Sequence, residues 1–387
     1  MPKARPTVID LFCGAGGLSE GFRQAGFKVL IGNDVDQASG RTFAATHPEA
    51  HFIGTPIQDL SVGRLLNIAG LAKGELDVLV GGPPCQGYSV YNHKRGMGDP
   101  RARLFEEYMR IVAGLRPKWI VMENVTGITS IENGELVQEI LTRFSELGYQ
   151  VDYRVLKAEQ YGIPQERRRV FFIGNRLGLS NPFPVPTHGP GLLPYVTVAQ
   201  AISDLPVLAN GGGIEVAKYR SAAKSAFQRA LRGNRTTVAN HFAPRLSPIN
   251  MQRMAHIPQG GSWRDIPVHL LPEGMKRAKR SDHTKRYGRL SEGGLACTIL
   301  TKCDLHWGAY IHPTQDRAIS VREAARLQSF PDSFEFFGSR TEQYVQIGNA
   351  VPPLLGKAVA EAVLTASTGI GQPKRRRIAQ HELLLTA

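Results

Sequence analysis

The sequence predicts an α/β protein built on a doubly wound, mostly parallel sheet, with a second, smaller and irregular domain later in the chain. Apolar runs rich in Val and Ile alternate with helix-compatible stretches over the first 175 residues, and a segment rich in Pro, Gly and Arg follows. Continuous apolar strands separated by helices are typical of a parallel sheet covered on both faces. The 387 residues and 42% hydrophobic content leave room for two domains with a sizeable core.

The expected elements follow one another in regular alternation. Strands are expected at 8–12, 29–34, 77–82, 119–122, 151–156 and 169–174. Helices are expected at 18–25, 37–46, 104–115, 135–147, 321–328 and 354–366. Because ligands of such sheets bind at the carboxyl ends of the strands, the loops after the first four strands are the candidate site.

The positive charge is concentrated in one segment. The chain carries a formal charge of +14, from 47 Lys and Arg against 33 Asp and Glu. Residues 218–289 hold 16 Lys and Arg but only three Asp and Glu, a net +13. A solvated surface is the simplest explanation of a charge run, but this concentration favours a face that binds nucleic acid.

Several classes of protein are disfavoured. No apolar run reaches 18 residues and no signal-peptide region precedes the first strand, so we expect a cytoplasmic protein without a membrane span. The four cysteines form no CxxC pair, which argues against a zinc site and a disulfide framework, and no metal is expected. Cys13, Cys297 and Cys303 are expected to be ordinary buried cysteines.

The first motif, DLFCGAGG, ends the first strand. Gly14, Gly16 and Gly17 allow a sharp turn and a close approach of the backbone to a ligand. Asp34 ends the second strand and is placed to accept hydrogen bonds from a ribose. The spacing is not GxGxxG, which argues against a dinucleotide-binding enzyme.

The second motif, GGPPCQGYS, follows the third expected strand. Pro83 and Pro84 restrict the backbone directly before Cys85, so that the thiol faces the crevice; a buried structural cysteine is the alternative. Residues 90–101 contain two glycines and four basic residues, counting histidine. That composition predicts a mobile lid over an anionic ligand.

Three further motifs carry polar groups toward the same crevice. Glu123 follows an apolar strand, where a carboxyl group can bind the edge of a heterocycle. In a strand, Gln165, Arg167 and Arg169 share one face and can point together into the site. Residues 346–353, QIGNAVPP, are expected to form a polar turn before a helix, just downstream of the expected helix at 321–328.

In this order, the motifs resemble the signature blocks of the DNA cytosine-5 methyltransferase family. The combination of PPCQ, ENV, QxRxR and GNAVPP is highly specific, and the resemblance covers residues 7 to about 175 and about 287 to 366. It implies a Rossmann-like domain that binds S-adenosyl-L-methionine over 1–178 plus 320–366. The basic segment takes the place of the family's variable target-recognition domain, here expected over 179–319, and a basic, flexible tail is expected over 367–387.

The resemblance also implies roles for individual residues. Cys85 resembles the catalytic nucleophile, and Glu123, Arg167 and Arg169 resemble the groups that hold the cytosine. The cofactor pocket is expected to contain Phe12, Gly14, Gly16, Gly17, Asp34, Val35, Pro84, Leu104, Asn349 and Ala350. Contacts to DNA are expected from Gln86, Ser89, Lys94, Arg95 and Gln165. The chain departs from the family at 54–59, where Thr55 and Pro56 stand in place of an acidic residue for the adenine amino group; Asp59 or the backbone is left to make that contact.

The expected reaction is methylation of carbon 5 of a cytosine that has rotated out of duplex DNA, through a covalent bond between Cys85 and carbon 6. S-adenosyl-L-methionine is the expected methyl donor, with S-adenosyl-L-homocysteine as its product. We expect a monomeric bacterial enzyme of the cytoplasm, associated with the nucleoid, which acts alone or beside a separate restriction endonuclease.

Four other functions fit parts of the sequence. A dehydrogenase would explain the first turn and Asp34, but neither PPCQ nor the basic segment. Methyltransferases of adenine N6 or cytosine N4 typically carry an aromatic residue after Pro-Pro, where this chain has a cysteine. An RNA cytosine-5 methyltransferase would share much of the architecture, and the basic segment favours duplex DNA over it. A non-catalytic DNA-binding relative would be expected to have lost site residues, which are intact here.

Overall fold

The computed structural model describes residues 5–84, 102–219 and 221–368. Its central element is a seven-stranded sheet in the order β3-β2-β1-β4-β5-β7-β6. The strands are β1 (Thr7–Leu11), β2 (Lys28–Asn33), β3 (His51–Ile53), β4 (Val78–Gly81), β5 (Trp119–Val125), β6 (Gln150–Lys157) and β7 (Arg168–Asn175). All neighbours from β3 to β5 pair in parallel, and β7 runs antiparallel to both β5 and β6. The predicted doubly wound α/β sheet is therefore confirmed.

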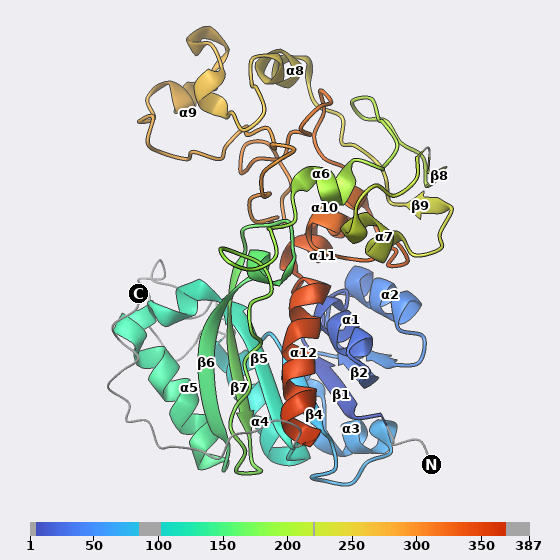
Figure 1. Cartoon of the computed structure of the whole chain (residues 1–387). Helices are drawn as coiled ribbons and strands as arrows, with labels where there is room; N and C mark the ends of the chain where they lie inside the picture. Colours follow the sequence, from blue (N-terminus) through green and yellow to red (C-terminus); the bar gives the residue numbers. More distant parts are fainter. Residues whose placement is uncertain (1–4, 85–101, 220, 369–387) are drawn as a thin grey trace.

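Helices cover both faces of the sheet (Figure 1). On β5, Ile120 and Met122 face one core while Trp119 and Val121 face the other, and all four are buried. The first core is closed by α3 (Val62–Ala69), α4 (Ala102–Leu115) and α5 (Glu135–Glu146). The second is closed by α1 (Gly17–Gln24), α2 (Gln37–Thr46) and α12 (Pro353–Thr368). A strand buried on both faces is apolar at most positions, which is why the central strands appear in the sequence as nearly continuous apolar runs.

Helix α12 returns from the far end of the chain to complete the sheet region. It packs against α1, and a Cβ on Gly21 would lie 2.5 Å from the backbone nitrogen of Lys357. Glycine at position 21 therefore lets the two helix backbones approach closely. This helix, the last within the described residues, thereby shares a core with the first strand and joins the second region to the sheet.

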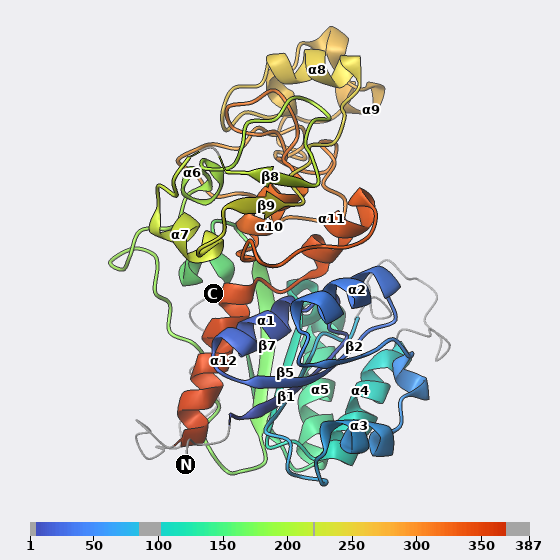
Figure 2. The same cartoon turned by 90° about the vertical axis from the view of Figure 1, so that its right-hand side faces the viewer.

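The second region lies above the carboxyl ends of the strands (Figures 1 and 2). It has little regular structure: α6 (Val198–Ile202), β8 (Val216–Lys218), α7 (Ala226–Arg232), β9 (Thr237–Ala239), α8 (Pro248–Ala255) and α9 (Glu273–Lys276). Helices α10 (Val321–Leu327) and α11 (Arg340–Asn349) connect it to α12, and the core of the second region includes apolar residues of both. The domain boundary predicted between residues 319 and 320 stays a prediction. The apolar side chains of α10, which follows this boundary, lie in the same core as residues that precede it.

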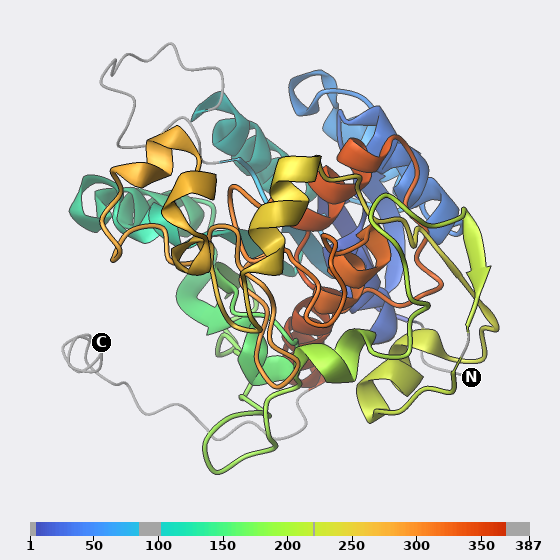
Figure 3. The same ribbon diagram turned by 90° about the horizontal axis from the view of Figure 1, so that it is seen from above.

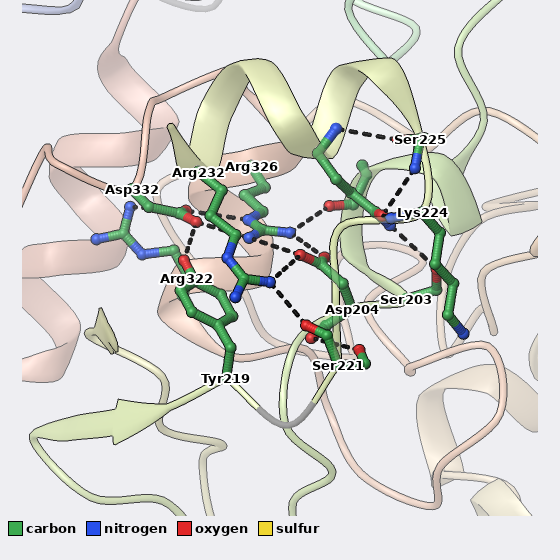
Figure 4. A network of polar contacts seen from close by, with 12 residues as sticks. Ser203, Asp204, Tyr219, Ser221, Lys224, Ser225, Arg232, Arg322, Arg326 and Asp332 are labelled. Carbon is green, nitrogen blue, oxygen red and sulfur yellow. Dashed lines mark hydrogen bonds and ion pairs between the residues drawn. The ribbon is translucent and has the colours of Figure 1, made fainter. Parts of the chain in front are cut away.

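A buried network of ions fastens α10 to the second region (Figure 4). Arg326 donates to Asp204, at the end of α6, and to both carboxylate oxygens of Asp332, at 3.0 and 2.6 Å. The hydroxyl group of Tyr219 donates to Asp332, and Arg232 lies 3.6 Å over the ring of Tyr219. Arg326, Asp204 and Asp332 are all shielded from solvent. Each buried charge therefore has an oppositely charged partner, as burial requires.

The expected strands and long helices are present with small shifts of their ends. Outside the second region, for which no elements were expected, the strand β3 and the helices α3 and α11 were not expected. The motif at 346–353 was expected to be a turn, but residues 346–349 form the end of α11 and only the stretch after Asn349 turns. Gly348 lies within this helix, and a Cβ there would lie 2.4 Å from the carbonyl carbon of Leu300. Its function is close packing of a helix against a loop.

Short 3-10 helices fill several connections, and none of the helices found in the described ranges is long and apolar enough to cross a membrane. The 3-10 helices are η1 (Ile57–Asp59), η3 (Thr126–Thr129), η4 (Ile131–Gly134), η5 (Ala158–Tyr161), η6 (Trp263–Asp265) and η7 (Val268–Leu270).

Candidate active site

The glycine turn after β1 is held by the carboxylate at the end of β2. The backbone N–H of Gly14 donates to Asp34 Oδ2 at 2.8 Å, and the N–H of Asp36 donates to Oδ1 at 2.9 Å. Phe12 and Gly16 both have a positive φ, 58° and 96°, which glycine adopts without strain and phenylalanine does not. Burial raises the pKa of Asp34, and the hydrogen bonds from the backbone oppose that shift.

The turn also contacts the segment that follows α11. A Cβ on Gly17 would lie 2.4 Å from the carbonyl oxygen of Val351 and 3.1 Å from the Cβ of Ala350. The predicted cofactor residues Gly14, Gly17, Asp34 and Ala350 therefore come together, although 333 residues separate Gly17 from Ala350. Close to these residues in sequence, Val35 is 59% exposed and Asn349 is exposed, so both offer side chains to a ligand.

The loop at residues 54–59, which lacks the acidic residue of the family, is held by hydrogen bonds to backbone carbonyl groups in and beside it. Asn33 Nδ2 donates to the carbonyl oxygens of Ile53 and Thr55, both at 2.8 Å. Arg110, on α4, donates to the carbonyl oxygens of Ile57 and Leu60 at 2.9 and 3.0 Å. Asp59 is exposed. Leu104, at the start of α4, is half-buried and packs against the core next to this helix.

An ion pair stands at the carboxyl end of β5. Glu123 Oε1 lies 2.8 Å from Arg169 Nε, and both side chains are largely buried. Burial raises the pKa of Glu123, while Arg169 and Arg167 act in the opposite direction. Glu123 was expected just after the strand, but β5 extends to Val125 and pairs Glu123 with Phe171 of β7. The sheet itself therefore fixes the backbone of both partners.

The same strand end supports the turn that precedes Cys85. A Cβ on Gly82 would lie 3.1 Å from Glu123 Oε2, and Asn124 Nδ2 donates to the carbonyl oxygen of Pro83 at 2.9 Å. Asn124 was not singled out from the sequence, although its place in the ENV motif offered a signal. Pro84 is exposed. The predicted residues Cys85, Gln86, Ser89, Lys94 and Arg95 lie outside the described residues.

The three residues of the QxRxR motif have different surroundings. Glu166 and Arg168 are exposed, and Gln165, Arg167 and Arg169 are at least partly buried, as strand alternation requires. Only Arg169 pairs with Glu123. Gln165 and Arg167 instead form hydrogen bonds with residues beyond position 290.

Arg167 and Gln165 fasten β7 to the rest of the chain. Arg167 donates to the carbonyl oxygens of Ile299, Gly348 and Ala350, at 3.1, 2.9 and 2.9 Å. Gln165 donates to the carbonyl oxygen of Leu327 and to the side chain of Gln328, and it accepts from the N–H of Ile299. Burial and the neighbouring Arg169 lower the pKa of Arg167 to about 9. It is still protonated at neutral pH.

Asp10 is a buried acid that the sequence analysis did not single out. It lies on β1, and Ser19 Oγ donates to its Oδ2 at 2.6 Å. Burial raises its pKa to about 7, and the charges of Asp34 and Glu123 act in the same direction. An acid inside an otherwise apolar strand was the available signal. Asp10 therefore links the glycine turn to the start of α1.

The basic segment is only partly available to a ligand. Among its described Lys and Arg side chains, nine are exposed: Lys218, Lys224, Arg229, Arg245, Lys276, Arg277, Lys279, Arg280 and Lys285. Arg289, in contrast, is buried and donates to the carbonyl oxygens of Ile257 and Met254 at 2.7 and 3.1 Å. Five of the exposed charges fall between residues 276 and 285, around and after α9, on the same side of the molecule as α5 (Figures 1 and 3).

Cysteines other than Cys85 form no disulfide. Cys13 and Cys303 are buried, Cys297 is half-buried, and all three are free. Burial raises the pKa of each of the three thiols. Within the described ranges, no three His, Cys, Asp or Glu residues group in a way that could hold a metal ion.

Comparisons with known proteins agree with this arrangement. The family model "C-5 cytosine-specific DNA methylase" matches residues 6–365. Type II methyltransferase M.AgeI of Thalassovita gelatinovora is 35% identical, over 93% of this chain and 99% of that protein. Type II methyltransferase M.DdeI of Desulfomicrobium norvegicum is 37% identical, over 92% of this chain and 88% of that protein.

Among solved structures, a protein of E. coli described as a DNA modification methyltransferase encoded within a prophage superimposes with a TM-score of 0.74. It is 26% identical and covers 94% of this chain and 99% of its own. The match of the family model spans the glycine turn, the strand-end acids and the return through α12 alike. The chain therefore belongs to the C-5 cytosine-specific DNA methylase family and is a DNA (cytosine-5)-methyltransferase.

Proposed function

We propose that the protein transfers a methyl group from S-adenosyl-L-methionine to carbon 5 of a cytosine in duplex DNA, through a covalent bond between Cys85 Sγ and carbon 6. One observation carries the proposal. The ion pair of Glu123 and Arg169 lies against Gly82, three residues before Cys85, and Asn124 holds the carbonyl group of Pro83 beside it. An acid, a base-binding cation and the chain that leads to a thiol thus meet at one strand end.

Carbon 5 of cytosine is a weak nucleophile until the ring is activated. Addition of the Cys85 thiolate to carbon 6 turns the ring into an enamine, whose electron density is at carbon 5. Positive charge from Arg169 and Arg167 favours the thiolate over the thiol. Carbon 5 would then accept the methyl group, and the bond between that methyl group and the cofactor sulfur breaks as the new carbon–carbon bond forms. Removal of the carbon-5 proton by a base re-forms the double bond between carbons 5 and 6 and expels the Cys85 thiolate, so that the enzyme is regenerated.

Glu123 supplies the proton that the activated ring needs. Its raised pKa keeps part of the population protonated at higher pH than an ordinary glutamate, so it can donate to N3 as negative charge develops. Arg169 holds the carboxyl group through Nε and the carbonyl oxygen of Arg168 through Nη1, and its Nη2 donors are left for the base or its phosphate. Arg167 and Gln165 act as positioning residues, because their hydrogen bonds hold the start of β7 in place.

The residues around the glycine turn fit the proposed cofactor. Each oxygen of Asp34 accepts one backbone N–H, which leaves each able to accept a ribose hydroxyl as well. Beyond the Gly14 Cα, a Cβ would meet no atom within 4 Å, so the backbone is open to a ligand. Phe12, Val35, Leu104 and Asn349 would line the site. When bound, S-adenosyl-L-methionine supplies an electrophilic methyl group on a sulfonium.

The target cytosine must leave the stack of bases before it can meet these groups, at a cost of a few kcal/mol. The exposed cations of the second region can offset that cost through contacts with phosphate groups. Both curated relatives described above are named Type II methyltransferases. We extend from them the proposal of a monomeric, cytoplasmic modification enzyme associated with the nucleoid, which acts alone or beside a separate endonuclease.

The first experiment is transfer of labelled methyl groups from the cofactor to unmethylated duplex DNA by the full chain and by Cys85→Ala. We expect transfer by the wild type and loss of transfer by the variant, because no other group can form the bond to carbon 6. Cys297→Ala is the matched control and should keep full activity. Undiminished transfer by Cys85→Ala would contradict the mechanism, and bisulfite sequencing of the product identifies the modified cytosine.

A second experiment traps the covalent intermediate. DNA with 5-fluorocytosine at the modified position cannot lose a proton from carbon 5, so the bond to Cys85 should persist and survive denaturing electrophoresis. Cys85→Ala should give no such adduct. Failure of the wild type to form the adduct on DNA that it binds would argue against addition to carbon 6.

A further inference from the structure

Trp307 is an exposed aromatic side chain in a cationic setting, and the reaction proposed above does not use it. It is 51% exposed, although a tryptophan of this size is normally buried. The guanidinium of Arg286 lies over its ring at 5.3 Å from the centroid. The ring of His306 packs edge-on against the ring of Trp307, with centroids 5.6 Å apart.

The loop that carries Trp307 begins at the edge of the candidate active site. Ala296 bridges to Gln165, Thr298 Oγ1 donates to the carbonyl oxygen of Glu166 at 2.7 Å, and Arg167 donates to the carbonyl oxygen of Ile299. The chain leaves this contact at Leu300, turns at Asp304 and returns at Tyr310. Five extended residues span roughly 17 Å, so the tip of this loop stays within one duplex diameter of the site.

The loop is braced on both arms. Tyr310 donates through its hydroxyl group to the carbonyl oxygen of Thr298 at 3.0 Å and accepts from the N–H of Leu300, which closes the base. At the tip, the N–H groups of His306 and Trp307 donate to the side chain and the carbonyl oxygen of Asp304, at 2.8 and 2.9 Å. A side chain on such a support can enter a stack of bases without first ordering its own backbone.

The surroundings of Trp307 select a polyanion as the partner. Lys302 is exposed within this loop, and Lys285 is exposed just before Tyr287, whose N–H donates to the carbonyl oxygen of Leu305 of the loop. Lys285 Nζ also lies 3.8 Å from Glu166 Oε2, beside the start of β7. Arg286 can stack on the indole and still direct its planar N–H groups to a phosphate. An apolar protein partner would not be matched by this cationic rim.

We infer that Trp307 stacks on a base of the target duplex beside the cytosine that has left it, while Arg286 binds an adjacent phosphate. The inference rests on the proposed function, since it assumes that a cytosine leaves the duplex at the neighbouring site. Aromatic side chains that insert between base steps compensate for lost base stacking, and this stacking tolerates different sequences. Trp307 is thus a positioning residue for the DNA.

Fluorescence tests the contact directly. The chain has three tryptophans, and Trp119 and Trp263 are only 1% and 3% exposed. Neutral acrylamide should therefore quench mainly Trp307. Adding a DNA duplex that the protein binds, chosen by a binding titration and not by methyl transfer, should quench the emission and reduce access of acrylamide in the wild type, and should have little effect on Trp307→Phe.

Binding measurements separate stacking from charge. Trp307→Ala should weaken binding of that duplex roughly 5- to 100-fold, whereas Trp307→Phe should lose less because it keeps an aromatic ring. Neither should change the slope of the logarithm of affinity against the logarithm of salt concentration, but Arg286→Gln should reduce that slope by about one. Tyr153→Ala, which removes an exposed ring from the edge strand β6, is the control and should bind as the wild type does.

Two outcomes would overturn the inference. One is unchanged DNA binding by Trp307→Ala together with DNA-independent emission of the wild type. The other is a change of Trp307 emission with protein concentration alone, which would indicate contact with a second copy of the chain. Equal thermal melting of Trp307→Phe and the wild type excludes misfolding. A wild type that binds and quenches on DNA but transfers no methyl group would contradict the proposed function and leave the DNA contact standing.

Discussion

Arginine serves different purposes in the two regions of this molecule. In the sheet region, Arg169 pairs with one carboxylate, Glu123, and both remain partly accessible at the end of β5. In the second region, Arg289, Arg322 and Arg326 are buried and donate to several carbonyl oxygens or aspartates each. The first arrangement leaves donors free for a ligand, whereas the second uses them to hold the fold.

The difference follows from how each region satisfies its backbone. In a sheet, the strands supply each other's hydrogen bonds, so a side chain at a strand end, such as Arg169, can stay available. Arg110 and Arg167 of the sheet region donate to carbonyl groups outside the strands, as the arginines of the second region do. The second region has little regular structure, and its buried carbonyl groups need other donors. A guanidinium offers five N–H groups and stays charged, which suits it to this task. The number of Lys and Arg residues in a basic segment is therefore only an upper bound on the number of charges that DNA can contact.

Glu123→Gln tests the role of the sheet region and should have the largest effect. Loss of a positioned acid should lower the rate of methyl transfer about 10²- to 10⁴-fold, while DNA binding and thermal melting stay close to the wild type. Single-turnover transfer and a binding titration with the same duplex measure the two effects. Glu139→Gln, on the exposed face of α5, should be fully active. A comparable loss of DNA binding in Glu123→Gln would contradict the proposal that Glu123 acts in methyl transfer and not in binding of the duplex.

Arg326→Met tests the second region. The substitution leaves Asp204 and Asp332 buried without their common partner, so we expect a loss of about 3–5 kcal/mol in the free energy of unfolding. Chemical denaturation followed by circular dichroism measures it. Arg229→Met, on the exposed side of α7, should cost much less. If Arg326→Met were as stable as the wild type, the network would not hold this region together.

Asp10 makes a pH-dependent contribution to the sheet region. Because its folded pKa of about 7 lies above the ordinary 3.8, the wild type should lose stability as the pH rises from about 4 to 7. Asp10→Asn lacks this titration, so its stability relative to the wild type should improve over that range, by at most about 4 kcal/mol. Denaturation of both proteins at pH 5 and pH 8 measures the difference. A constant difference would show that Asp10 does not titrate there.

The exposed charges after α9 should give the smallest effect. Replacing Lys279 and Arg280 with glutamine should reduce the salt dependence of DNA binding by up to about two phosphate contacts. The rate of methyl transfer at saturating DNA should not change. Binding at several salt concentrations provides the measurement, with Lys73→Gln in the sheet region as the control. An unchanged salt slope would place the DNA elsewhere on the second region.

The predicted site residues rest on local sequence signals, and Cys85 among them stays a prediction. The turn glycines, the Pro-Pro-Cys segment and the ENV strand end each lie within a few consecutive residues. Gln165, Arg167 and Arg169 were expected to share one face, and the alternating burial from 165 to 169 agrees with that expectation. Which of them meets Glu123 could not be predicted, since Arg167 takes its partners from residues more than 130 positions away.

In the first 175 residues, the sequence alone predicted most strands and helices in their order, but not β3 or α3. Local apolar patterns are sufficient for the central strands, because a strand buried on both faces is apolar at most positions. Only the tertiary structure decided that Arg167 binds backbone while Arg169 binds Glu123, that Gly348 packs inside a helix, and that Trp307 stays exposed. Those outcomes depend on which distant backbone groups lack a hydrogen-bond partner or a covering side chain, and chain folding alone brings such groups together.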